Sequence, residues 1–185
     1  CDEEGNSGGM LNLVPRLNQL RKEENLEYLA LLDTDYMTSE FEGDENKYVY
    51  VGTVGKLMPT FYVVGKETHV GESFKGLDPN QITAQIISRI NLNPEFCEVT
   101  LPPVTLRQQD LKTEYSCQIA KSAILYFNYA THCSTPDQIL ERMVGVAQEC
   151  FQEVVDALNR YYRTFCNMSR RPFHPLPWKA RVMTY

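Results

Sequence analysis

The sequence predicts a mixed α/β fold, with an α/β first half and a helical second half. A β-rich run, Phe61 to Val64, begins directly after Pro59, and isoleucines at helical spacing follow it at Ile82, Ile86, Ile87 and Ile90. Further along, two long stretches with helical apolar spacing flank Cys133 and Ser134. We therefore expect two regions, 1–95 and 96–185, the second ending in a basic, proline-rich tail.

Composition narrows the range of functions. The chain has 185 residues, of which 43% are hydrophobic and 23% charged, as in ordinary globular proteins. Its net charge of −6 argues against binding to nucleic-acid phosphates. No apolar run is long enough to span a bilayer, and no glycine-rich phosphate loop or zinc-binding motif is present. We expect neither a cofactor nor a metal.

The first region begins with a helix over about 10–22, which carries an apolar stripe and contains Pro15. A buried strand is expected at 27–32 and a short strand at 48–51. Between them, residues 38–46 are acidic. They could form a carboxylate cluster for calcium, but they lack the spacing of an EF-hand loop, so a solvated, mobile loop is the favoured interpretation.

The segment around Pro59 is the centre of this region. An X–Pro bond has little trans preference, so the Met58–Pro59 bond is a candidate cis peptide. A strand follows at 61–64, then a polar turn, a second strand at 69–74 that ends at Gly76, and a helix over 82–90.

This order of elements resembles the C-terminal half of a thioredoxin domain, in which a cis-proline precedes a β-hairpin and the last helix. Met58, Pro59 and Thr60 match the family's cis-proline motif, and the helix near residue 10, with its internal proline, matches the helix after the redox site. The family's C-x-x-C positions fall on Ser7, Gly8, Gly9 and Met10, where both cysteines are missing. Without a thiolate and a resolving thiol there is no disulfide exchange at this place.

The resemblance therefore implies a redox-inactive binding module of the protein disulfide isomerase-like kind. Its groove would take an extended peptide by backbone pairing. The residues that would line it are Ser7, Gly8, Gly9, Met10, Met58, Pro59 and Thr60.

The opening strand, helix and strand of that fold have no counterpart before Cys1. Either the chain is a fragment of a longer protein, or other residues fill those places. Residues 179–185 alternate in polarity and form a candidate last strand for an empty sheet position.

The second region is expected to be an antiparallel helical hairpin. One helix is predicted over about 107–131. The next begins at Thr135, a good N-cap followed by Pro136, Asp137 and Gln138, and runs to about residue 166.

Folding this hairpin about Cys133 and Ser134 would place Cys117 opposite Cys150 and Cys97 near Cys166, which predicts two disulfides. Cys1 and Cys133 would stay free or bond to missing parts of the protein. With the glycosylation sequon at Asn167, these cysteines favour an oxidising compartment, the endoplasmic reticulum lumen or the extracellular space. The alternative is a cytoplasmic protein with small buried thiols.

Catalysis is not indicated. His132 beside Cys133 suggests a nucleophile and a base, but adjacent residues rarely face each other. Asp33 and Asp35 follow a predicted strand, where turn-forming aspartates are common.

The favoured function is a binding or scaffold module that holds a protein or peptide partner, within a larger protein or complex. A groove filled by the chain's own helical half, which binds nothing, stays open. The rival class is a thiol-disulfide oxidoreductase that uses Cys1 or a cysteine of the second region.

Overall fold

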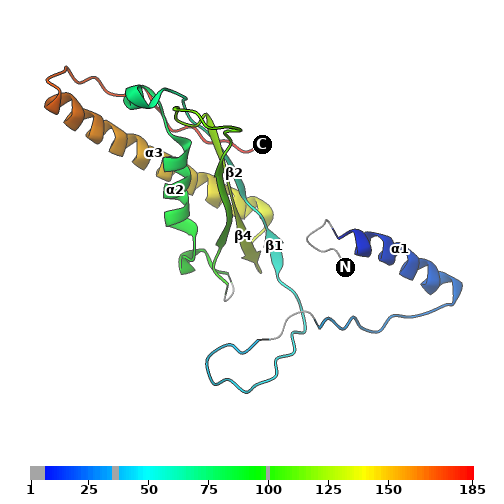
Figure 1. Cartoon of the computed structure of the whole chain (residues 1–185). Coiled ribbons are helices and arrows are strands. Elements are labelled where there is room, and N and C mark those ends of the chain that lie inside the picture. Colours follow the sequence, from blue (N-terminus) through cyan, green and yellow to red (C-terminus); the bar gives the residue numbers. More distant parts are fainter. Residues whose placement is uncertain (1–6, 35–37, 99–100) are drawn as a thin grey trace. The chain divides into compact units, whose positions relative to one another are not determined.

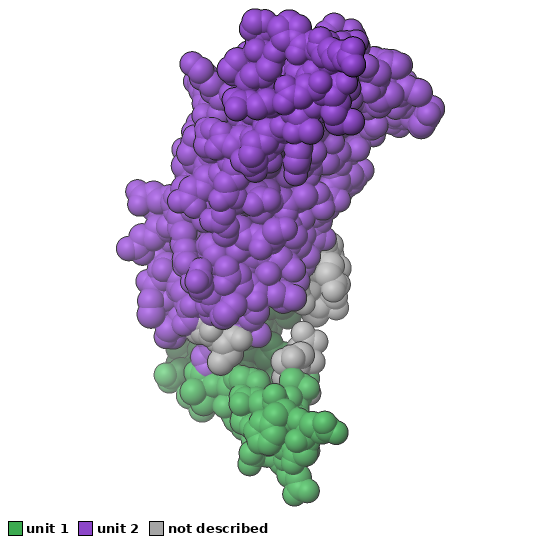
Figure 2. Space-filling model, turned by 90° about the vertical axis from the view of Figure 1, so that its left-hand side faces the viewer, with its two compact units in different colours: residues 1–51 green, residues 52–185 purple. Residues whose placement is uncertain are grey.

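The computed structural model describes residues 7–34, 38–98 and 101–185 (Figure 1). The chain divides into two units, residues 1–51 and residues 52–185 (Figure 2). The boundary expected between residues 95 and 96 falls inside the second unit, within the 3₁₀ helix η3 (Pro94–Phe96) that precedes strand β3 (Val104–Asp110).

Unit 1 contains one helix, α1 (Gly8–Glu23), among its described residues, which confirms the helix expected near residue 10. After a turn in which Asn25 takes a left-handed conformation (φ 51°), residues 26–34 contain no helix or turn and pair with no described strand. The strands expected at 27–32 and 48–51 do not form among the described residues, because a strand needs a partner to satisfy its backbone groups and neither segment has one here.

The acidic loop of unit 1 is organised around Asp44. Its carboxylate accepts hydrogen bonds from the backbone N–H of Glu40 and Asn46, both at 3.1 Å, and from the Tyr48 hydroxyl at 2.6 Å. The Tyr48 bond is the main reason that the pKa of Asp44 lies below its usual value. Since protein donors occupy this carboxylate, Asp44 acts as the structural centre of the loop.

Unit 2 is built on an antiparallel sheet whose central strand is β4 (Ser122–Thr131). β1 (Gly55–Leu57) and β2 (Thr60–Val64) both pair with one side of β4, and β3 pairs with the other. A register shift between Thr105 and Arg107 marks an irregularity in β3.

Helices α2 (Pro79–Ile90) and α3 (Pro136–Met168) cover one face of this sheet (Figure 1). Burial alternates along β4, and the inward side chains are Ala123, Leu125, Phe127 and Tyr129. They pack against the isoleucines of α2 and against Ile139, Met143, Ala147, Cys150 and Val154 of α3. One face of the sheet is thus buried, and no helix among the described residues of unit 2 covers the other, as is common in antiparallel sheets.

α3 begins where the sequence predicts, and α2 begins at Pro79, three residues before the predicted start at 82. The Asp78 carboxylate accepts from the N–H of Asn80, and Pro79 occupies the first turn of α2. Thr135 and Gln138 form a reciprocal capping box at the start of α3. These caps satisfy N–H groups that would otherwise have no partner in the first turn.

The helix expected over 107–131 is wrong, because β3 and β4 occupy this stretch. Apolar residues in β4 fit both a period of four and a period of two, and its aromatic and β-branched content favours the strand. The second strand expected at 69–74 is also wrong. A 3₁₀ helix, η2 (Val70–Lys75), lies there instead.

The tail forms no strand, so the last strand expected at 179–185 is not found. The backbone of the tail is held by α3, where Asn159 Oδ1 accepts from the N–H of Leu176 at 2.8 Å. Gln148 Nε2 donates to the carbonyl of Ala180 at 3.3 Å. Trp178 and Val182 pack against the core, which explains why this irregular segment stays close to α3.

None of the helices in the described part of the chain is long and apolar enough to cross a membrane.

Candidate functional site

The strongest candidate site is the outer edge of the sheet in unit 2. Leu57 of β1 pairs with Tyr129 of β4, and Thr60 of β2 pairs with Tyr126 of β4. β1 and β2 therefore pair with β4 in the same register, which continues across Met58 and Pro59. β1 and β2 are therefore two pieces of one edge strand, interrupted at a proline.

Backbone groups of β2 point alternately toward β4 and away from it. The N–H of Gly65 donates to the carbonyl of Lys121 at 2.9 Å, which makes this a hydrogen-bonded pair. Because such pairs alternate in an antiparallel ladder, the N–H and C=O of Thr60, Tyr62 and Val64 point away from β4. No described strand pairs with this side of β2. We call residues 60–64 with these groups the open edge.

Both ends of the open edge are defined. At one end, Lys66 and Leu77 exchange two backbone hydrogen bonds, at 2.8 and 3.0 Å, and close the edge. At the other, the Thr60 hydroxyl donates to the carbonyl of Met58 at 3.0 Å. The carbonyl of Pro59 faces β4 and accepts from the N–H of Phe127 at 3.3 Å.

Side chains of β2 separate into a buried and an exposed set. Phe61 and Val63 pack against the core, and the Phe61 ring meets Phe127 edge to face at 6.1 Å between centroids. Tyr62 and Val64 are 64% and 56% exposed and stand on the face opposite α2 and α3. The open edge therefore offers unpaired backbone groups beside two apolar side chains.

The residues predicted from the thioredoxin resemblance fall in both units. Met58, Pro59 and Thr60 lie at the start of the open edge, but the Met58–Pro59 bond is trans, so the expected cis bond is wrong. A trans proline is well placed here because it starts β2 at a sheet edge. Ser7, Gly8, Gly9 and Met10 lie in unit 1, where Ser7 precedes α1 and the other three begin it.

The predicted disulfides Cys117–Cys150 and Cys97–Cys166 are wrong, since all four are free thiols, as is Cys133. Their prediction assumed a helical hairpin, and Cys117 lies instead between β3 and β4. Cys150 is buried in α3, and this burial is the main cause that raises its pKa to about 11. Cys1, the thiol invoked for an oxidoreductase, lies outside the described residues.

The turn between β4 and α3 contains the His132–Cys133 pair considered for catalysis. A single carboxylate oxygen of Glu98 accepts the backbone N–H of His132, Cys133 and Ser134, at 2.8, 2.9 and 3.0 Å. The pKa of Glu98 is lowered to about 2 by the hydrogen bonds that its carboxylate accepts. The side chain of Ser134 has the largest effect, followed by the backbone N–H groups of Ser134, His132 and Cys133. Nothing in the sequence predicts this contact, which joins residues far apart in the chain.

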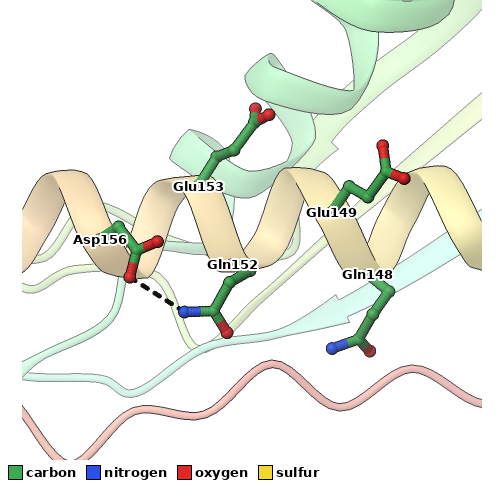
Figure 3. A pocket seen from close by; sticks show the side chains of 5 residues that line it. All are labelled: Gln148, Glu149, Gln152, Glu153 and Asp156. Atoms are coloured by element: carbon green, nitrogen blue, oxygen red, sulfur yellow. Dashed lines mark hydrogen bonds between the residues drawn. The ribbon is translucent and has the colours of Figure 1, made fainter.

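The other candidate side chains do not come together to form a site in the described part of the chain. Among residues 7–34, 38–98 and 101–185, no group of three or more His, Cys, Asp and Glu side chains is arranged to hold a metal ion. Asp35, considered with Asp33, is outside the described residues. A shallow hollow of about 380 Å³ runs along α3. In Figure 3 its glutamates, Glu149 and Glu153, point to one side of the helix while Gln148 and Gln152 point to the other.

Comparison with known proteins gives two relatives, while no family model matches the sequence. Bacillus subtilis protein RocB is 37% identical over 186 residues, which cover 98% of this chain and 33% of RocB. The uncharacterised Bacillus subtilis protein YqjN is 33% identical over 189 residues, which cover 100% of this chain and 34% of YqjN. The chain thus spans about a third of the length of the curated relatives it matches.

These relatives correct the expected localisation. Both come from a bacterium, which has no endoplasmic reticulum, so placement in that lumen is wrong. The case for an extracellular location used the cysteines as disulfides, and the thiols found here remove that support. Asn167 lies exposed in the last turn of α3, and its glycosylation stays a prediction.

Proposed function

We propose that unit 2 is a polypeptide-binding module that holds an extended segment of a partner protein at the open edge. The observation that carries this proposal is the outward row of backbone groups at Thr60, Tyr62 and Val64, which no described strand uses. Exposed strand edges bind extended peptides by adding a strand, and main-chain hydrogen bonds then supply much of the affinity.

The exposed side chains and free backbone groups of the open edge are suited to an apolar, extended partner segment. Tyr62 and Val64 would lie beside alternate side chains of the added strand, since cross-strand neighbours share a face. Lys66 lies two residues after the edge and its backbone is already paired with Leu77, which limits the added strand to the length of β2. The partner would therefore be a short segment with alternating apolar residues.

The edge is also formed before any partner binds. Phe61 and Val63 anchor the strand in the core, and β4 pairs with every residue of β2. A partner strand would meet a preformed template and would lose less free energy to ordering than it would on a mobile loop.

Proline substitution tests the proposal without breaking the sheet. In Tyr62→Pro the lost N–H is one that points away from β4, so the β2–β4 ladder keeps its hydrogen bonds. Peptides would be selected on the whole chain from a random library displayed on phage, and the affinity of a synthetic selected peptide would be measured by calorimetry.

We expect Tyr62→Pro to lower the affinity for that peptide by about 10-fold or more, because the bound strand loses a hydrogen bond and collides with the proline ring. The matched control is Tyr62→Thr, which keeps the N–H while shortening the side chain. Equal affinity for the wild-type chain and Tyr62→Pro, or a failure to select any peptide, would contradict the proposal.

A further inference from the structure

Unit 1 displays an apolar segment that is independent of the open edge. Residues 26–32 read Leu-Glu-Tyr-Leu-Ala-Leu-Leu and form an open trace without helix or turn (Figure 1). Leu29, Leu31 and Leu32 are 89%, 87% and 89% exposed, close to the exposure of a fully solvated chain. A contiguous run of exposed leucines such as this indicates a surface that another polypeptide segment covers in the functional protein.

Both faces of this segment are apolar. In an extended chain Leu29 and Leu31 point to one side, while Tyr28, Ala30 and Leu32 point to the other. A strand that covers one face of a core alternates in polarity, whereas a strand inside a parallel sheet with helices on both faces is apolar throughout. Residues 28–32 have the second pattern, and Glu27 near the start of the segment is its one charged residue.

The arrangement of α1 and this segment is the one found in such a sheet. Residues 24 and 25 reverse the chain, so that the segment runs back beside α1 in Figure 1, and the Tyr28 hydroxyl donates to the carbonyl of Leu17 at 2.9 Å. A helix, a two-residue turn and an apolar strand are the second half of a βαβ unit. α1 itself has no buried residue, and Leu11 is 70% exposed.

The two relatives indicate what covers this surface. Each is about three times as long as this chain, and each matches the chain over almost its whole length, unit 1 included. A polypeptide of that length has room for the neighbouring strands and helices that residues 26–32 lack.

We propose that α1 and residues 26–32 are a helix and an interior strand of a parallel α/β sheet, whose other strands come from the part of a RocB-length polypeptide outside these 185 residues. Unit 1 would then be the docking surface that joins this third of the protein to the rest.

Hydrogen exchange with mass spectrometry tests this on the full-length gene product and on the 185-residue chain made alone. We expect peptides within residues 26–32 to exchange about 100-fold more slowly in the full-length protein, where their amides would be paired. Equally fast exchange in both would overturn the proposal, as would a gene product no longer than this chain. Protection in the isolated chain that rises with its concentration would assign the surface to a second copy instead.

A substitution gives an independent readout. Leu31→Asp should lower the melting temperature of the full-length protein by about 5 °C or more, because it buries a charge inside the sheet. Met168→Asp, at a residue 80% exposed on α3, is the matched control and should change it little. An unchanged melting temperature in Leu31→Asp would contradict the proposal. The open edge lies in unit 2, so neither result depends on peptide binding there.

Discussion

The carboxylate of Glu98 lies 2.9 Å from the backbone nitrogen of Cys133 and ties the segment after η3 to the turn before α3. Three consecutive N–H groups converge on this one oxygen, and Ser134 adds its side chain. A carboxylate that accepts several such bonds is stabilised in its charged form, which accounts for a pKa of about 2. The turn is therefore shaped by a residue that precedes it by more than thirty positions.

Glu98→Gln should lower the free energy of unfolding by about 1 kcal/mol at neutral pH, since the amide keeps the shape but loses the charge. Because the folded pKa is depressed, this contribution is present above the ordinary pKa of 4.5 and is lost as the pH falls toward 2. Urea unfolding of the wild type and the variant at several pH values measures the difference. Glu141→Gln, on the exposed side of α3, is the control, and a gap that persists unchanged at pH 2 would refute this account.

Thiol labelling should divide the described cysteines by burial. Cys117 and Cys133 are exposed and should react in the native chain, whereas Cys150 and Cys166 should react only after unfolding. Burial also raises the pKa of Cys150 to about 11, which keeps its reactive thiolate scarce at neutral pH. Mass spectrometry after alkylation without reductant measures this, and a disulfide-linked Cys117–Cys150 peptide would disprove the free-thiol structure.

Packing, more than ion pairs, should hold α2 against α3. Arg89 contacts Glu149 at 3.2 Å and Glu153 at 2.7 Å, but all three side chains are partly or largely exposed. We expect Arg89→Ala to cost about 0.5 kcal/mol and Ile86→Ala, at a fully buried site, about 3 kcal/mol. Chemical denaturation of both variants makes the comparison, and the reverse order of costs would show that charge dominates this interface.

Replacing Gly65, directly after β2, is expected to destabilise the chain. A Cβ there would collide with the carbonyl oxygen of Leu77 and lie 2.7 Å from Pro79 Cδ. Gly65→Ala should therefore cost about 1–3 kcal/mol by forcing apart the Lys66–Leu77 bridge. Gly145→Ala is a matched control on α3 with open space around it, and it should stabilise the chain by about 0.5–1 kcal/mol. Thermal melts that rank the two variants the other way would contradict this reading.

Local signals in the sequence predicted several elements correctly. Thr135 and Gln138 mark the start of α3, the isoleucine spacing marks α2, and Pro59 marks the start of β2. Each of these depends on contacts within a few residues, so the chain reports them directly.

Long-range contacts decided the elements that were missed. β4 could be read as a helix or a strand until its pairing with β2 and β3 was known. The disulfide prediction failed with that helix, since it placed Cys117 and Cys150 on facing elements that do not exist. Met58, Pro59 and Thr60 are predicted from the sequence to bind a partner, and they lie at the start of the open edge. Tyr62 and Val64 of that edge were not predicted, although their alternation with Phe61 and Val63 is visible in the sequence.

Backbone amide exchange at Tyr62 and Val64, with and without a selected peptide, tests the binding role of the open edge most directly. These two N–H groups point away from β4, whereas that of Val63 is already paired with it. The account predicts that saturating peptide slows exchange at Tyr62 and Val64 by about 10-fold or more and leaves Val63 unchanged. Unchanged exchange at Tyr62 and Val64 in the saturated complex would contradict it.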